Sequence, residues 1–330
     1  MGDIPIAIEA NPALPNNNVD RNCRLESGFS VLIQSMEPGN LLMRQGSLGM
    51  MKTAVILFQC FDQKGILAKI TCFLFGVDAN IISVDQYTTD SENGRFFLRI
   101  AFFFNSQKIA PAELESEFSR VAQYMNAEWS IFYQGNLLKM GILVSKPLHC
   151  LVEILNNWKA GDLAVDIPCV ISNHEDHRAL VEYYGLPFHH LPVTSADKRE
   201  EDISLTAAHC DFLVLARYMQ ILSSDFLDQF KKPIINSHHS FLPSFKGADP
   251  YRQAFDRGVK VIGATAHYVT PDLDEGPITA QMVSPVSHRD SAESMRRKGK
   301  HMEKVTLLEA IQLHIDHRVI PYGNKTIVFS

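Results

Sequence analysis

The chain has 330 residues, of which 46% are hydrophobic and 21% are charged, and its formal net charge at neutral pH is -6. This composition is typical of a globular protein, and the length is sufficient for two domains. The negative charge argues against nucleic-acid binding, which needs clustered Lys and Arg, and no apolar run approaches the roughly 20 residues of a membrane helix. We therefore expect neither a nucleic-acid partner nor a membrane anchor.

Residues 1–50 are rich in Pro, Asn, Gly and Ser and have weak hydrophobic periodicity, which predicts a flexible extension. Transit peptides are poor in acidic residues, whereas this segment contains Asp3, Glu9, Asp20, Glu26 and Glu37. We expect a cytoplasmic protein, with organelle targeting by this extension as the alternative. The six cysteines are scattered and form no CxxC pair, which argues against a metal knuckle and a disulfide framework.

A first unit is expected over residues 51–134. Its hydrophobic patterns predict strand, helix, strand, strand, helix, strand, with Asp62 as a start signal for the first helix and a hairpin turn at residues 90–94. The predicted ranges are 54–58, 66–74, 80–84, 96–103, 111–125 and 129–133. This order is that of the split βαβ, ferredoxin-like fold.

Two stretches of this unit, FDQKGI at residues 61–66 and DANI at 78–81, resemble ACT domains. The resemblance implies self-association and an amino-acid effector near the first loop, with Asp62, Gly65 and Asn80 as the candidate effector site. Asp78 stands where related sequences usually carry Gly, and Asp tolerates the left-handed conformation less well than Gly. A purely structural dimerisation unit therefore remains an alternative.

A second unit is expected over residues 135–330, where strands alternate with helices. The predicted strands are 140–144, 166–172, 188–192, 211–216 and 233–236, and the predicted helices are 149–158, 178–184 and 305–315. Such alternation predicts a parallel, doubly wound sheet, in which ligands bind beyond the carboxyl ends of the strands. Residues 217–219 and 236–238 follow two such strand ends.

Three residues in this unit could form an acid–base cluster. Asn236 and His238 are two apart on an extended segment and should point to the same side. The amide can donate to a developing oxyanion, the imidazole can exchange a proton near neutral pH, and Asp274, on a loop before a Gly-Pro turn, could orient the imidazole. Each piece is weak alone, since an isolated His after a strand is more often structural.

The combination is more specific. The motifs NSH at 236–238, LPSF at 242–245 and LDEGP at 273–277 resemble the 10-formyltetrahydrofolate formyltransferase-fold family, which fits residues 139–330. Together with the ACT-like unit, ISNH at 171–174, ARYMQIL at 216–222 and YGNKT at 322–326, the resemblance is to the formyltetrahydrofolate deformylases. It implies an α/β protein in which an N-terminal ferredoxin-like ACT domain precedes a Rossmann-like parallel-sheet formyltransferase domain. It also implies a homo-oligomer that hydrolyses 10-formyltetrahydrofolate to formate and tetrahydrofolate. The formate would supply one-carbon metabolism and purine synthesis. The resemblance implies no metal and no cofactor beyond the folate.

The resemblance also assigns residues. Asn236 matches the oxyanion-binding asparagine, and His238 and Asp274 match the catalytic histidine and aspartate. The expected folate-binding residues are Arg217, Tyr218, Met219, Ile221, Leu222, Val269, Thr270 and Leu273. Ser237 departs from the usual Ile and is expected to face away from the catalytic pair, and the stretch 197–209 is shorter than in relatives, which puts one surface helix in question.

Two alternative functions stay open. A glycinamide ribonucleotide formyltransferase would need a Gly-rich phosphate loop at a helix N-terminus after the first strand of this unit, but residues 145–150 read SKPLHC, without glycine and with a proline that lacks an N–H. A non-catalytic folate or amino-acid sensor would not need the intact acid–base cluster. His239 is expected on the opposite face from His238, and the basic run 296–301 is expected to be a solvated helix face, with a folate polyglutamate tail as the alternative ligand.

Overall fold

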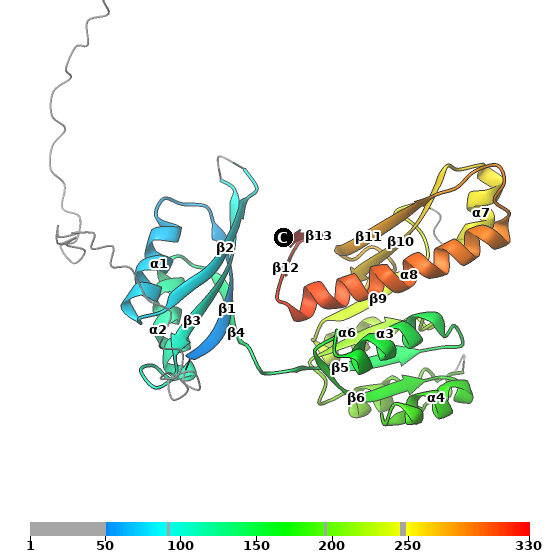
Figure 1. Cartoon of the computed structure of the whole chain (residues 1–330), viewed down its shortest axis with the longest axis horizontal. Coiled ribbons are helices and arrows are strands. Elements are labelled where there is room, and N and C mark those ends of the chain that lie inside the picture. Colours follow the sequence, from blue (N-terminus) through cyan, green and yellow to red (C-terminus); the bar gives the residue numbers. More distant parts are fainter. Residues whose placement is uncertain (1–50, 91–92, 195–196, 245–248) are drawn as a thin grey trace, which may run out of the picture. The chain divides into compact units, whose positions relative to one another are not determined.

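The computed structural model describes residues 51–90, 93–194, 197–244 and 249–330, so the extension 1–50 and part of the expected turn at 90–94 lie outside the described residues. The described chain forms a four-stranded sheet, a seven-stranded sheet and a two-stranded hairpin (Figure 1). No described helix has the length and the apolarity needed to cross a bilayer.

The four-stranded sheet has the order β2-β3-β1-β4 and is antiparallel throughout. Its strands are β1 (Met51–Phe61), β2 (Asn80–Thr88), β3 (Arg95–Asn105) and β4 (Glu128–Tyr133), and its helices are α1 (Ile66–Gly76) and α2 (Pro111–Tyr124). Buried residues alternate along β1, as expected for a sheet with one face covered by helices. The predicted ferredoxin-like order is confirmed. The helix starts later than expected, after Gly65 rather than at Asp62, because Gly65 adopts the left-handed conformation that precedes the first turn.

The seven-stranded sheet has the order β11-β10-β9-β8-β5-β6-β7. Its strands are β5 (Leu138–Val144), β6 (Val165–Ser172), β7 (Phe188–His190), β8 (Phe212–Ala216), β9 (Ile234–His238), β10 (Val261–Tyr268) and β11 (Ile278–Pro285). Strands β5 to β9 are parallel, as predicted, whereas β10 runs antiparallel to both β9 and β11. Strands β10 and β11 extend the predicted parallel sheet beyond β9, and the loop that carries Asp274 connects them.

Helices cover this sheet. They are α3 (His149–Ala160), α4 (Arg178–Tyr183), α5 (Glu200–Thr206), α6 (Ser224–Phe230), α7 (Pro250–Arg257) and α8 (Ala292–Ile315), and β12 (Val319–Tyr322) and β13 (Lys325–Val328) form the terminal hairpin. The helix in question at residues 197–209 is therefore present, as α5. Helix α8 is longer than the predicted 305–315 because Ser291 caps it by accepting a hydrogen bond from the Ser294 amide.

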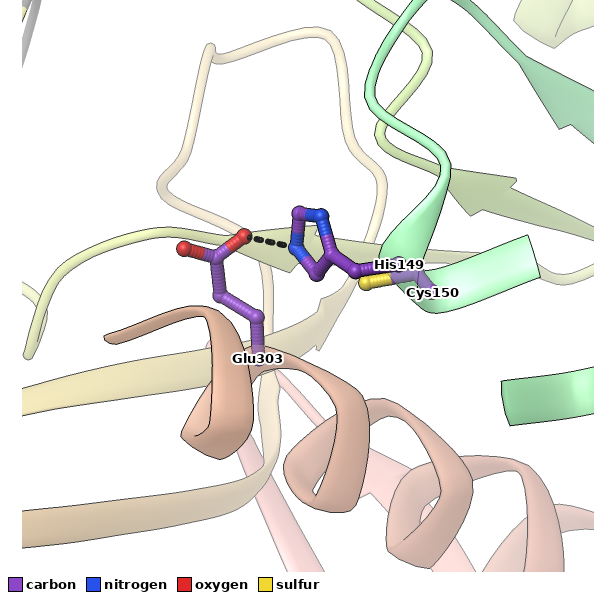
Figure 2. Close-up of side chains that lie close together, drawn as sticks. All are labelled: His149, Cys150 and Glu303. Atoms are coloured by element: carbon purple, nitrogen blue, oxygen red, sulfur yellow. Dashed lines mark hydrogen bonds and ion pairs between the residues drawn. The ribbon is translucent and has the colours of Figure 1, made fainter. Parts of the chain in front are cut away.

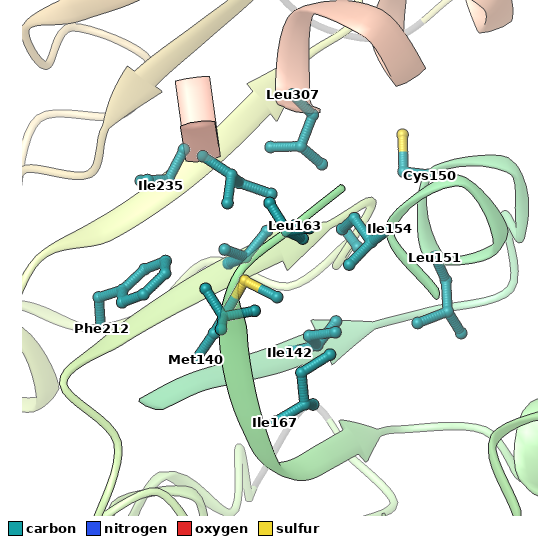
Figure 3. Packing of buried hydrophobic residues seen from close by; sticks show 14 of the residues in the cluster. Met140, Ile142, Cys150, Leu151, Ile154, Leu163, Ile167, Phe212, Ile235 and Leu307 are labelled. Carbon is teal, nitrogen blue, oxygen red and sulfur yellow. The ribbon is translucent and has the colours of Figure 1, made fainter. Parts of the chain in front are cut away.

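The main core of this unit lies between the sheet and helices α3 and α8. Met140 and Ile142 of β5 pack with Ile154 of α3 and Leu307 of α8, all of them fully buried (Figure 3). Burying each such side chain contributes roughly 1.5–3 kcal/mol. This packing fixes the position of β5 and of its neighbours β8 and β9, whose carboxyl ends carry the candidate site.

Candidate active site

A cavity of about 300 Å³ lies beyond the carboxyl ends of β8 and β9, where a parallel sheet is expected to bind its ligand. Its wall contains all eleven residues that the sequence assigned to catalysis and folate binding. These are Arg217, Tyr218, Met219, Ile221, Leu222, Asn236, His238, Val269, Thr270, Leu273 and Asp274. They come from three segments that are separated in the sequence by as many as 57 positions, so their convergence is a result of the fold.

His238 and Asp274 face each other in this cavity. The Nδ1 atom of His238 lies 3.2 Å from Oδ2 of Asp274, and both side chains are largely buried. Burial would raise the pKa of Asp274, but the hydrogen bond from His238 and the nearby His267 outweigh it and hold that pKa well below its usual range. The carboxylate is therefore ionised at neutral pH and orients the Nδ1–H of His238. The Nε2 atom of His238 is buried and has no hydrogen-bond partner among the described residues, so it is free to meet a ligand.

The backbone of the β10–β11 loop places Asp274. Asp274 itself has a left-handed conformation, with φ 58°, which Asp tolerates better than most residues. Two residues later, a Cβ on Gly276 would lie 1.8 Å from the carbonyl oxygen of Tyr268. This contact is possible for glycine alone, and the close approach of the two loop ends fixes the direction in which Asp274 points.

Asn236 is oriented by a residue that sequence reasoning missed. His267 lies opposite Asn236 in the antiparallel pairing of β10 with β9, and its Nε2 is 3.3 Å from the Asn236 side-chain nitrogen. The Nδ1 of His267 lies 3.0 Å from the Tyr268 carbonyl oxygen, which can accept but not donate. His267 therefore carries a proton on Nδ1, and its Nε2 can accept an N–H of Asn236. The second N–H of that amide remains for a ligand oxygen.

The loop after β8 is held by Ser145 at the end of β5. The Ser145 hydroxyl accepts a hydrogen bond from the Met219 amide at 3.0 Å and donates to the Asn173 side chain, and the Ser145 amide donates to the Arg217 carbonyl at 3.2 Å. Arg217 has a left-handed conformation, with φ 62°. From the other side, the Lys198 ammonium group donates to the Ile221 carbonyl. The loop is thus braced from two directions.

Comparison with known proteins decides the family. The formyl transferase family model matches residues 138–311, and the ACT domain model matches residues 54–114. A formyltetrahydrofolate deformylase of Bacillus subtilis (strain 168) is 46% identical over 83% of this chain and 93% of its own length. The chain belongs to the formyltetrahydrofolate deformylase family.

Solved structures agree with this membership. The crystal structure of a formyltetrahydrofolate deformylase from Pseudomonas syringae pv. tomato, 39% identical, covers 86% of this chain and 96% of its own, with a TM-score of 0.80. Glycinamide ribonucleotide transformylase 1 from Symbiobacterium toebii, 30% identical, covers 60% of this chain and 97% of its own, with a TM-score of 0.56. The deformylase match thus extends well beyond the part shared with the transformylase.

A second polar cluster in this deformylase-family chain contacts Arg217 through Glu303. His149, Cys150 and Glu303 bring three atoms that could bind a metal within 4.8 Å of one another (Figure 2). The Glu303 carboxylate is already engaged, because it lies 2.7 Å from His149 Nε2, accepts from the Tyr251 hydroxyl at 2.6 Å and lies 3.4 Å from Arg217 Nε.

The titration of this cluster is consistent with a network anchored on Glu303. Burial raises the pKa of Cys150, and the charge of Glu303 adds to this effect, so the thiol is protonated. Burial also acts to raise the pKa of Glu303, but His149, Arg217 and Tyr251 together lower it to about 2. We therefore interpret the cluster as a hydrogen-bonded network that holds Glu303 in an ion pair with Arg217, and the absence of a metal stays a prediction.

Two histidines of the cavity were not assigned from the sequence. His267 belongs to strand β10, which was not predicted. Its position in the sequence, seven residues before Asp274, is the one signal that could have identified it. His239 was expected to face away from His238, but β9 ends at His238, so the strand alternation does not extend to it, and its ring also lines the cavity. Burial lowers the pKa of His239 to about 4, and the nearby charge of Arg217 adds to this effect. His239 is therefore neutral at pH 7.

The candidate effector residues do not form one site within the described chain. Asp62 and Gly65 precede α1, whereas Asn80 follows it, and all three are exposed. The 11 residues of α1 separate the two positions by about 16 Å at 1.5 Å per residue. Asp78 has the left-handed conformation expected where related sequences carry Gly, with φ 58°, and pairs with Lys108.

Proposed function

We propose that this chain hydrolyses 10-formyltetrahydrofolate to formate and tetrahydrofolate. The observation that carries the proposal is the placement of Asn236, His238 and Asp274 in one cavity of a chain that matches deformylases over most of its length. The formyl group would lie between the His238 Nε2 and the free N–H of Asn236. No step of the proposed reaction needs a group other than the folate, water and these side chains.

The reaction proceeds in two steps. A water molecule near the Asp274 carboxylate attacks the formyl carbon, forming a C–O bond while the carbonyl π electrons move to its oxygen, and the water passes one proton to the Asp274 carboxylate, which later returns it to His238. Asn236 and the protonated His238 donate hydrogen bonds to this oxyanion, and removing one such donor typically costs about 2.7–4 kcal/mol of transition-state stabilisation. The C–N10 bond then breaks, N10 receives a proton from His238 or through a bridging water, and the formyl carbon leaves as formate.

The apolar rim of the cavity suits the pterin ring. Met219 is 54% exposed, and Ile221 and Leu273 are each 58% exposed, although all three are large apolar residues that line the cavity wall. Ligand pockets characteristically present such surfaces beside a few placed polar groups. We therefore assign the loops 217–222 and 269–274 to folate binding.

The geometry after β5 favours water over an amine acceptor that carries a phosphate. The Ser145 amide is taken up by the Arg217 carbonyl, and Pro147 has no N–H. Two of the four residues between β5 and α3 therefore offer no amide to a phosphate at this helix N-terminus.

The family also suggests partners and a location for this chain. The ACT domain suggests an amino-acid effector, which would bind between copies of a homo-oligomer if Asp62, Gly65 and Asn80 all contribute. Formate release would supply one-carbon metabolism and purine synthesis. A cytoplasmic location stays a prediction.

The test is to incubate the full chain with 10-formyltetrahydrofolate and to quantify formate and tetrahydrofolate, with and without glycinamide ribonucleotide. We expect equal amounts of both products without the amine. His238→Ala should abolish formate release while folate binding persists, whereas His288→Ala, at an exposed histidine outside the cavity, should behave as the wild type. Turnover that requires the amine would favour the transferase, and no turnover at all would favour the sensor.

A further inference from the structure

A second, larger cavity of about 770 Å³ adjoins the proposed reaction site. It shares three wall residues, Arg217, Met219 and His239, with the first cavity, so the two cavities are neighbours across these side chains. The other wall residues that set its charge are Lys146, His149, Asp249, Arg296, Lys300 and Glu303. We propose that this second cavity is a carboxylate-binding chamber that receives the formate released in the first, an inference that rests on the proposed hydrolysis.

The charge of the chamber favours a small anion. Four of its wall residues are Lys or Arg and two are acidic. Both acidic groups are already paired, Asp249 with Arg296 at 3.0 Å and Glu303 with His149 and Arg217. Lys146 and Lys300 have no ion-pair partner among the described residues. The basic run 296–301 is thus partly a cavity wall and not entirely a solvated face.

Arg217 stands at the boundary between the two cavities. Its side chain is 13% exposed, and its Nε lies 3.4 Å from the Glu303 carboxylate without forming a hydrogen bond to any described residue. A guanidinium group has five N–H donors in a fixed plane that matches the two oxygens of a carboxylate. Arg217 can therefore engage a second carboxylate while Glu303 holds it in place.

The proposed reaction gives a physical reason for a separate formate-binding chamber. Formate, like other carboxylic acids, is ionised at neutral pH, and it is released beside the ionised Asp274, which repels it. The loops 217–222 and 269–274, assigned above to folate binding, line the first cavity. The positively charged chamber beyond Arg217 would let formate leave the reaction site before tetrahydrofolate dissociates.

The test measures the binding of ¹³C-labelled formate to the full chain by NMR, without folate and at constant ionic strength. In the double variant Lys146→Gln/Lys300→Gln, the dissociation constant for formate should rise by at least about threefold, the size expected for loss of two partly solvated charges. Inhibition of turnover by added formate should weaken in the same proportion. Lys159→Gln, which removes an exposed charge at the far end of α3, is the matched control and should bind formate as the wild type does.

Two results would overturn the chamber. One is equal formate binding in the double variant and the wild type. The other is displacement of formate by inorganic phosphate at far lower concentration than by acetate, which would assign the chamber to a phosphorylated ligand. Failure of the hydrolysis would appear separately, as a wild type that releases no formate from 10-formyltetrahydrofolate, because the binding measurement does not depend on turnover.

Discussion

Replacing Asp274 with Asn tests the electrostatic core of the site. The carboxylate lies 3.2 Å from His238 and 3.6 Å from His267, and its side chain is 14% exposed, so solvent screens these contacts little. A hydrogen bond to a charged group contributes about 1.5–3 kcal/mol, and losing the one from His238 in the transition state corresponds to about 10- to 10²-fold in kcat. We expect Asp274→Asn to lower kcat by this amount and to change the affinity for tetrahydrofolate by less than about threefold, since Asp274 acts on the histidines.

The same substitution has a defined effect on stability. The folded-state pKa of Asp274 lies below its unfolded value of about 3.9. The ionised carboxylate therefore stabilises the fold fully above that pH, and this contribution is lost as the pH falls toward the folded pKa. The difference in free energy of unfolding between wild type and variant, from urea titrations, should shrink below about pH 4.

A control at a carboxylate outside the cavity separates these effects from the loss of any negative charge. Asp228→Asn changes an exposed carboxylate on α6 that has no side-chain partner among the described residues, and it should leave kcat and stability unchanged. A kcat for Asp274→Asn within tenfold of the wild type would refute the reasoning. So would an equal loss of activity in Asp228→Asn.

Three further substitutions test the support of the site. Gly276→Ala places a Cβ 1.8 Å from the Tyr268 carbonyl oxygen, so urea unfolding should show a loss of about 2 kcal/mol or more together with reduced formate release, and an unperturbed variant would contradict the loop geometry. His267→Phe removes the acceptor that orients Asn236 and should lower kcat by about tenfold, the value of one hydrogen bond, with little change in KM; a change in KM alone would assign His267 to binding. Ser237→Ala removes a buried hydroxyl that has no partner among the described residues, and thermal unfolding should show equal or higher stability, by up to about 1 kcal/mol.

Local patterns predicted most of the fold. The strands of the first sheet and β5 to β9 have continuous or alternating apolar residues, and their ends were located within a few positions. Strands β10 and β11 were not predicted, because the motif at residues 267–277 indicates a loop and the residues on either side of it were not interpreted as strands. In addition, hydrophobic periodicity does not distinguish a parallel strand from an antiparallel one. Long-range pairing, which the sequence does not encode locally, decides that β10 lies beside β9.

The sequence predicted the catalytic residues of the site but not the residues that position them. Asn236, His238 and Asp274 were identified from motifs, and the structure brings them into one cavity. The neighbours that tune them were not predicted: His267 comes from the unpredicted strand, His239 lies just beyond a strand end, and Glu303 lies 86 positions after Arg217. Such positioning residues contact the catalytic residues only in the folded chain. Their spacing in the sequence therefore does not identify them.

The central claim is that water attacks the formyl carbon in the cavity of Asn236, His238 and Asp274. Its most direct test is a single turnover of 10-formyltetrahydrofolate by the full chain in H₂¹⁸O, with mass analysis of the products. The account predicts formate that carries one ¹⁸O atom, tetrahydrofolate in equal amount, and neither product from His238→Ala. Formate without the label, or a formyl group recovered on an amine instead of as formate, would contradict it.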